Sequence, residues 1–305
     1  MRYDVIIIGA GPAGMSAALD AAYLKLKALV LDADVAGGAL SQTYPWKRVD
    51  SFLGFRDMKG MDVARRLVEH VRKEGIEIRE HEKAEEVSRG KRFTVRTARG
   101  KYDSSAIIIA TGIRGLPRQL SAPGERLAGV EYSVSDPAQY DGKRVLVIGG
   151  GDSAADTALG LYEAGAQVWL AHRKHELRAR DECRERLESS GVEILWDTEV
   201  ASIRGKGKVE KVVLANNQTG ERRELECDSV IISIGSFPAE ELIKALGIRM
   251  KDSLVKVDAD GMTALKGVFA AGDIVSPIKR IPQALASGER AAYGAYKFIK
   301  SPYWK

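Results

Sequence analysis

Cysteine is scarce in this 305-residue sequence, which contains only Cys183 and Cys227 and no C-x-x-C pair. Two cysteines so far apart make no disulfide framework, and no histidine stands beside either one to suggest a zinc site. We interpret Cys183 as part of a charged helix and Cys227 as the residue that leads into a buried strand. The sequence therefore predicts no metal site, no catalytic triad and no reactive thiol.

Long hydrophobic runs are also lacking. The longest uncharged apolar stretch extends from Val5 to Leu19, and three glycines and a proline interrupt it. This stretch is shorter than the roughly 18 residues needed to span a membrane, and Asp4 argues against a signal peptide. We therefore predict a cytoplasmic protein with no membrane partner.

Neither sign of charge dominates the sequence. Lys and Arg number 47 and Asp and Glu number 42, which gives a formal net charge of +5. Such an excess favours an acidic partner without implying nucleic acid, and no nucleic-acid-binding motif accompanies it. Hydrophobic residues at 45% and charged residues at 29% are typical of a folded globular protein.

Two glycine-rich turns stand out, one at residues 9–14 (GAGPAG) and one at 149–154 (GGGDSA). Each lies between an apolar run and an Ala-rich stretch, and a second apolar run follows, which predicts a strand, turn, helix and strand in each half. One glycine turn of this kind is weak evidence for a nucleotide site, whereas two in the same context are much stronger.

The rest of the chain repeats this plan. A buried strand ends each half, at 106–110 before Thr111-Gly112 and at 230–234 before Gly235, and an alternating segment before each predicts an antiparallel meander. Length alone favours about two domains. We predict an α/β fold with two Rossmann-like, three-layer nucleotide-binding domains, in which residues 116–237 are inserted into a domain formed by 1–115 and 238–305.

The two halves differ in the charge that follows each turn. Twenty-three residues after the first glycine, one half has Asp32 and the other has His172-Arg173-Lys174, with Arg178 close behind. An acid at this position suits free ribose hydroxyls, and a basic cluster suits a 2′-phosphate. The pattern predicts a flavin site and an NADPH site, although a solvated strand end and a solvated basic cluster are the simpler alternatives.

These motifs resemble the flavoprotein pyridine nucleotide reductases with the thioredoxin-reductase architecture. The resemblance also covers Gly37-Gly38-Ala39-Leu40 and Phe269-Ala270-Ala271-Gly272-Asp273, in family order. It implies FAD and NADPH as cofactors, a homodimer, and a flavin ribityl chain bound by Asp273. The FAD site would comprise Gly9, Gly11, Pro12, Ala13, Gly14, Asp32, Gly38, Leu40, Gln42, Tyr44, Thr111, Gly112, Gly272 and Asp273. The NADPH site would comprise Gly149, Gly151, Asp152, Ser153, Ala154, His172, Arg173, Lys174, Arg178, Ile234 and Gly235.

The sequence departs from thioredoxin reductases where they carry a redox C-x-x-C-D. Tyr132 and Ser135 stand at the two cysteine positions and Asp136 follows, so no internal disulfide can carry electrons away. This segment resembles instead the ferredoxin-NADP reductases of the thioredoxin-reductase-like type, as does Tyr44-Pro45. The resemblance makes Tyr44 a candidate for stacking on the isoalloxazine, with an ordinary turn aromatic as the alternative. Tyr303-Trp304 could cover the other flavin face, although a frayed tail is the simpler interpretation.

The resulting hypothesis is hydride transfer from NADPH to FAD, followed by electron delivery to an acidic ferredoxin or flavodoxin. Lys47, Arg48, Arg56 and Lys59 follow Tyr44 and are candidates to receive such a partner. One alternative is reduction of another acceptor, such as a separate disulfide protein, a quinone or oxygen. The other is a flavin or NADPH sensor without catalysis.

Overall fold

The computed structural model describes residues 2–113, 117–235, 241–300 and 302. The chain divides into two compact units, and each is described by itself. Unit 1 comprises Met1–Leu116 and Phe237–Lys305, and unit 2 comprises Pro117–Ser236. Residues 116 and 237, where we placed the domain boundaries, lie outside the described residues, as do Tyr303 and Trp304.

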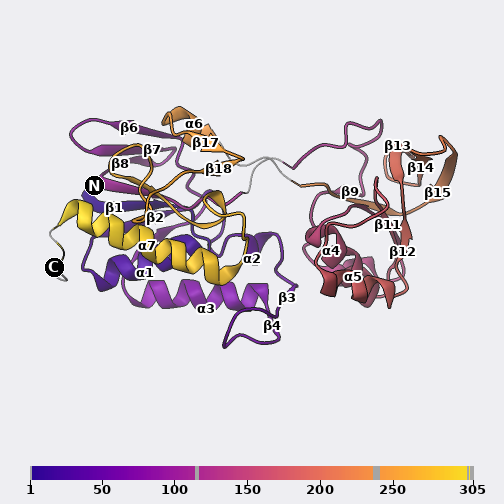
Figure 1. The fold of residues 1–305 in the computed structure, drawn as a ribbon, viewed down its shortest axis with the longest axis horizontal. Coiled ribbons are helices and arrows are strands. Elements are labelled where there is room, and N and C mark those ends of the chain that lie inside the picture. The colour runs from indigo at the N-terminus through magenta and orange to yellow at the C-terminus, as the bar shows by residue number, and fades with distance from the viewer. Residues whose placement is uncertain (1, 114–116, 236–240, 301, 303–305) are drawn as a thin grey trace. The chain divides into compact units, whose positions relative to one another are not determined.

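Unit 1 is built on a seven-stranded sheet (Figure 1). Its path is β5 (Glu77–Arg79), β2 (Ala28–Leu31), β1 (Arg2–Ile8), β8 (Gly100–Ile109), β7 (Phe93–Thr97) and β6 (Glu86–Arg89), and β19 (Val268–Ala270) also pairs with β8. Strands β5, β2, β1, β8 and β19 pair in parallel, whereas β6 and β7 are antiparallel. The strands are continuous apolar runs because both faces of a parallel sheet are buried.

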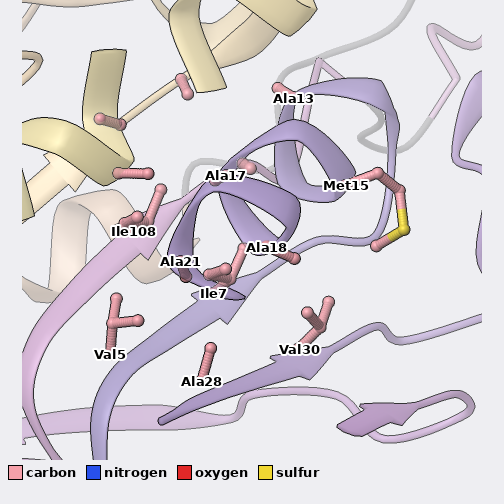
Figure 2. Packing of buried hydrophobic residues seen from close by; sticks show 14 of the residues in the cluster. Val5, Ile7, Ala13, Met15, Ala17, Ala18, Ala21, Ala28, Val30 and Ile108 are labelled. Atoms are coloured by element: carbon pink, nitrogen blue, oxygen red, sulfur yellow. The ribbon is translucent and has the colours of Figure 1, made fainter. Parts of the chain in front are cut away.

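Three helices pack together in unit 1, namely α1 (Pro12–Tyr23), α3 (Gly60–Lys73) and α7 (Ile281–Ile299), with α1 in contact with both others. Small side chains on α1 allow the helices and the sheet to approach closely, and Figure 2 shows Ala17 and Ala21 packed over Ile7 and Ile108. The remaining elements are α2 (Ala39–Gln42), β3 (Arg48–Val49), β4 (Met58–Lys59), α6 (Glu241–Ala245), β17 (Met250–Lys251), β18 (Leu254–Val255) and the 3-10 turn η2 (Gly272–Ile274).

Unit 2 repeats the plan with fewer strands. Its parallel sheet runs β12 (Glu193–Leu195), β11 (Gln167–Ala171), β10 (Arg144–Gly149), β16 (Ser229–Ser233) and β9 (Val130–Glu131). A separate antiparallel sheet contains β13 (Thr198–Arg204), β14 (Lys211–Asn216) and β15 (Arg222–Glu226). The helices are α4 (Asp152–Glu163) and α5 (Asp181–Glu188), with the 3-10 turn η1 (Pro137–Tyr140).

The structure confirms the α/β class and corrects several predicted elements. The meander predicted in unit 1 is continuous with its Rossmann sheet, because β8 pairs with β7 through its first half and with β1 along most of its length. The charged amphipathic pattern of residues 57–74 predicts one helix, and in the structure this helix begins at Gly60. Asp57 has a positive φ of 61°, and the two residues after it pair with β3. The sequence also predicts a short helix at 239–246; residues 239 and 240 lie outside the described residues, and α6 covers part of the remainder.

Candidate functional site

The first glycine turn joins β1 to α1 and is shaped by two very close backbone approaches. A Cβ on Gly9, whose φ is 110°, would lie 2.3 Å from the Ala110 carbonyl oxygen. A Cβ on Gly14 would lie 1.8 Å from the Gly9 carbonyl oxygen. Gly11 differs, because its nearest neighbour would be the Gly38 Cα at 3.7 Å. The outer glycines are therefore needed for chain packing, while the middle one leaves open space where a ligand backbone can approach.

The second glycine turn joins β10 to α4 in the same way. A Cβ on Gly149 would lie 2.3 Å from the Ser233 carbonyl oxygen, and one on Gly151 would meet no atom within 4 Å. The third position is Ala154, whose methyl group packs beside Gly149. The equivalence of Gly9 with Gly149 and of Gly11 with Gly151 is thus one of geometry as well as sequence.

Both turns lead into helices whose first N–H groups carry no side-chain cap. Gly11 caps α1 and Gly151 caps α4, and neither cap has a side-chain hydrogen bond. The unpaired N–H groups of a helix N-terminus and its dipole favour a bound anion. Together with the open space at each middle glycine, these two helix ends fit the pyrophosphate of a dinucleotide.

Asp32 lies at the carboxyl end of β2, against the first turn. The Ala10 N–H donates to its Oδ2 at 2.6 Å, and the Asp34 N–H donates to its Oδ1 at 2.9 Å. The backbone of Glu82 also donates to the Asp32 carbonyl oxygen at 2.7 Å. The carboxylate is therefore held beside the glycine turn, where we predict that it meets a ribose.

Thr111 and Gly112 follow β8 on the other side of the same turn. Thr111 Oγ1 is buried and has no hydrogen-bond partner among the described residues, a situation that native structures usually avoid. Gly112 has a φ of 65°. An unsatisfied buried hydroxyl at this edge of the sheet fits a bound group that donates to it or accepts from it.

The segment from Gly38 to Tyr44 lies in front of the first turn. A Cβ on Gly38, with φ of 61°, would lie 2.7 Å from the Gly11 Cα, so a side chain there would occupy the space at the turn. The Gln42 amide donates to the Val35 carbonyl oxygen. The carbonyl oxygens of Leu40 and Tyr44 contact Gly60, where a Cβ would lie 2.9 and 2.4 Å from them. The start of α3 therefore fixes this segment.

Tyr44 is half-buried, and the Lys47 ammonium lies 5.6 Å from the centre of its ring. This cation–π contact holds one side of the phenol near a positive charge. Stacking of Tyr44 on a flavin stays a prediction.

Gly272 and Asp273 follow β19, so they lie at the same end of the sheet as Thr111 and Gly112, which follow β8. Gly272 has a φ of 83°, and its N–H donates to Ser287 Oγ at 2.8 Å. Burial raises the pKa of the Asp273 carboxyl, and Lys279 opposes this effect. A buried carboxyl of this kind is suited to hydrogen bonding with hydroxyl groups.

In unit 2, His172 does not lie where the sequence suggested. Its ring is 8% exposed, and Nε2 is 3.0 Å from the Glu176 carbonyl oxygen. A Cβ on Gly150 would lie 2.1 Å from the ring, so the imidazole packs beneath the glycine turn. Burial lowers the pKa of His172. The geometry therefore argues against His172 as a charged phosphate donor and favours a packing role.

Arg173, Lys174 and Arg178 lie next to His172 and are exposed. Their side chains form no salt bridge with any other described residue. The Arg178 N–H donates to the Gly150 carbonyl oxygen at 2.7 Å, which ties this loop to the turn. Three unpaired cations beside the turn fit a 2′-phosphate.

Other predicted residues have structural partners. Asp152 Oδ1 accepts from the backbone N–H of Arg180 at 2.8 Å, and Ser153 is half-buried in the first turn of α4. Ile234 packs against the core of unit 2, and Gly235, with φ of 94°, accepts from the Arg118 N–H at 3.0 Å. Sequence reasoning missed Arg180, which also lies 3.8 Å from the buried Asp156, because no motif marks an arginine that pairs across 24 residues.

Tyr132 and Ser135 show no sign of redox chemistry. The Tyr132 hydroxyl donates to Glu125 Oε1 at 2.5 Å, and burial together with Glu125 raises the Tyr132 pKa to about 12. Ser135 is exposed. Cys183 and Cys227 are both buried and not disulfide-bonded, and burial raises the pKa of each thiol. Two inert thiols cannot serve as a dithiol relay.

Two other features are absent from the described part of the chain. No group of three or more His, Cys, Asp and Glu side chains there is placed to hold a metal ion. Among the helices described, none is both long and apolar enough to cross a membrane.

Comparison with known proteins identifies the class. Residues 3–288 match the pyridine nucleotide-disulphide oxidoreductase family. The chain belongs to this family and is a flavoprotein oxidoreductase that binds a nicotinamide nucleotide. The predicted family resemblance is confirmed.

Individual relatives cover the full chain. The ferredoxin–NADP reductase of Ignicoccus hospitalis is 36% identical over 305 residues, with 99% of each chain covered. The thioredoxin reductase of Bacillus subtilis is 34% identical, with 98% of this chain and 95% of that one covered. Among solved structures, thioredoxin reductase from Lactococcus lactis superposes with a TM-score of 0.90 at 33% identity, covering 97% of this chain and 99% of that one.

Proposed function

We propose that this protein passes electrons from NADPH, through FAD bound in unit 1, to a ferredoxin. The observation that carries this proposal is the combination of two open glycine turns with no thiol at Tyr132 and Ser135. Relatives named ferredoxin–NADP reductase, from Ignicoccus hospitalis and Thermus thermophilus, support it at 36% and 35% identity. Flavodoxin is a second acceptor of the same kind.

The residues of unit 1 fit FAD. The Gly11 and Gly38 backbones leave space for the pyrophosphate at the α1 N-terminus, Asp32 would receive the ribose, and the unsatisfied Thr111 hydroxyl would hydrogen-bond a polar group of the cofactor. Asp273 would hold the ribityl hydroxyls. Bound FAD supplies hydride acceptance and single-electron release, while the chain supplies position and charge.

The residues of unit 2 fit NADPH better than NADH. The open space at Gly151 accepts the pyrophosphate, and Arg173, Lys174 and Arg178 supply three cations for the 2′-phosphate. No described side chain neutralises these cations, which favours a doubly charged group at this position.

The acceptor would dock near the segment that carries Tyr44. Lys47 and Lys59 anchor the two ends of the β3–β4 hairpin, and Leu53 between them is 97% exposed. Arg48 and Arg56 share a single acid, Asp57, at 3.7 and 3.5 Å. The excess positive charge around an exposed apolar residue suits an acidic ferredoxin. The homodimer and the cytoplasmic location stay predictions.

An anaerobic acceptor panel tests the proposal. Purified protein is mixed with NADPH and, in turn, ferredoxin, flavodoxin, thioredoxin and a quinone, while ferricyanide reports flavin reduction independently of docking. We expect rapid ferredoxin reduction that falls steeply as salt rises, because exposed charges are screened over about 10 Å at 0.1 M ionic strength. Preferred reduction of thioredoxin or the quinone would reassign the acceptor, and flavin colour that NADPH cannot bleach would favour a sensor.

A further inference from the structure

A cavity of about 360 Å³ lies in unit 1 at the edge of the sheet opposite the glycine turn. It is formed by the turn between β6 and β7, by Lys266 before β19 and by the last residues of α7. Figure 1 places this β6–β7 turn at the end of unit 1 that also holds the N-terminus and the end of α7. Arg92 reaches the Tyr3 carbonyl oxygen, six residues before Gly9, which is about 20 Å along an extended strand.

The cavity is lined by four cations, Arg89, Lys91, Arg92 and Lys266. No carboxylate is found among the described residues that line it. None of the four forms a salt bridge within the described parts of the chain, whereas seven other arginines of unit 1 do. All four side chains are exposed, and four cations around one hollow give it a positive potential that attracts an anion.

The floor of the cavity is apolar and well defined. Phe93 and Phe298 meet above Gly267, where a Cβ would lie 3.0 Å from both rings. The Arg89 guanidinium lies 5.9 Å from the centre of the Phe93 ring. The Phe93 ring is buried and gives the exposed Arg89 guanidinium a fixed surface to lie against. The volume lies in the range of about 300–1,000 Å³ that is typical of small-ligand sites.

We propose that this cavity is a second anion site, distinct from both dinucleotide sites, which binds a phosphate-bearing ligand. Phosphate fits because arginine guanidinium groups bind its oxygens in pairs and because a charge of about −2 balances the cluster better than a carboxylate does. The same chemistry is offered by a free phosphorylated molecule and by an anionic lipid headgroup, and the experiment separates the two.

The test uses the flavin-bound, full-length protein saturated with NADP+, so that the proposed phosphate positions of unit 2, at Gly151 and at the cations Arg173, Lys174 and Arg178, are occupied before the probe is added. Inorganic pyrophosphate is titrated by calorimetry at low salt, and sedimentation measures binding to vesicles that contain phosphatidylglycerol. The cavity variant is Lys91→Gln/Lys266→Gln, because neither lysine side chain forms a hydrogen bond or salt bridge with a described residue. Lys73→Gln/Lys256→Gln is the control, with the same loss of charge on exposed parts of unit 1.

We expect pyrophosphate binding that weakens about tenfold in the cavity variant, the loss of roughly one charge-assisted hydrogen bond, and stays unchanged in the control. Vesicle binding with the same dependence, in the absence of pyrophosphate binding, would identify a lipid headgroup as the source of the phosphate. Equal binding by the cavity variant and the control, or no binding of either probe, overturns the proposal.

Discussion

The two units share the geometry of the glycine turn but differ in the side chain that follows the neighbouring strand. In unit 1 the residue after β2 is Asp32, whose carboxylate bends back and accepts from the Ala10 N–H of the turn. In unit 2 the equivalent residue is His172, a buried ring that packs beneath Gly150. The charged groups are displaced to the following residues, Arg173 and Lys174.

This difference assigns separate roles to the glycine turn and to the residue after the strand. The turn leaves space and N–H groups for a pyrophosphate in both units, and this depends on backbone geometry alone. We propose that the strand end then selects the ribose, with an acid held by the turn in unit 1 and exposed cations in unit 2. Selectivity can therefore change in one unit without disturbing the other.

The largest expected effect comes from adding one methyl group to the first glycine of either turn. Gly9→Ala places a Cβ 2.3 Å from the Ala110 oxygen, and Gly149→Ala places one 2.3 Å from the Ser233 oxygen. Overpacking of this kind costs about 3 kcal/mol where the turn keeps its shape, so the turn must shift and lose its fit to a pyrophosphate. Gly9→Ala should yield protein with little flavin, and Gly149→Ala should yield coloured protein that NADPH reduces poorly. Flavin absorbance per chain and stopped-flow reduction measure the two outcomes.

Gly100→Ala is the control for this comparison, because its Cβ would meet only the Tyr102 hydroxyl at 3.6 Å. It should retain both flavin and NADPH reduction. Loss of flavin from Gly149→Ala, with retention in Gly9→Ala, would show that we have assigned the cofactors to the wrong units.

A smaller loss of NADPH binding is expected when the exposed cations of unit 2 are neutralised. Arg173→Gln/Lys174→Gln should raise the NADPH KM by about tenfold or more, because each charge-assisted hydrogen bond contributes about 1.5–3 kcal/mol and exposure reduces this. The NADH KM should not change, since NADH lacks the 2′-phosphate. Steady-state ferricyanide reduction measures both constants. Lys206→Gln/Lys208→Gln, an equal loss of exposed charge in unit 2, is the control, and an identical change for both nucleotides would argue against phosphate recognition.

The sequence predicted the elements around both turns because they combine a strong apolar pattern with residues of fixed geometric use. The patterns at 12–23 and 28–31 predict a helix and a strand, and α1 and β2 have these bounds. The prediction for a side chain failed where a contact between residues distant in sequence decides whether that side chain is buried. His172 is buried because Gly150 has no side chain, and the pattern of residues 172–178 carries no sign of that. The sequence pattern did not indicate the basic cavity for the same reason, because Lys266 and the β6–β7 turn are far apart in the chain.

The smallest expected effect is on stability, and it comes from the buried or half-buried acid in the first helix of each unit. Asp156 of α4 is buried and lies 3.8 Å from Arg180, whereas Asp20 of α1 is half-buried and faces Glu289 of α7. Burial first, and then repulsion by Glu289, raises the pKa of Asp20 to about 6. The folded pKa exceeds the unfolded value of about 3.9. Asp20 therefore contributes stability below pH 4 that is lost as the pH rises through 6.

Asp20→Asn should accordingly stabilise the protein at pH 7 and not at pH 4. The expected gain is about 1 kcal/mol, reduced from the full shift because solvent screens a half-exposed carboxylate, and it corresponds to a rise of about 2 °C in the melting temperature. Thermal unfolding of the flavin-bound protein at both pH values measures it. Glu69→Gln, an exposed acid on α3, should leave both melting temperatures unchanged. A gain from Asp20→Asn that is equal at pH 4 and pH 7 would mean that the amide packs better in this helix interface. The unfavourable ionisation of Asp20 would then not be the cause.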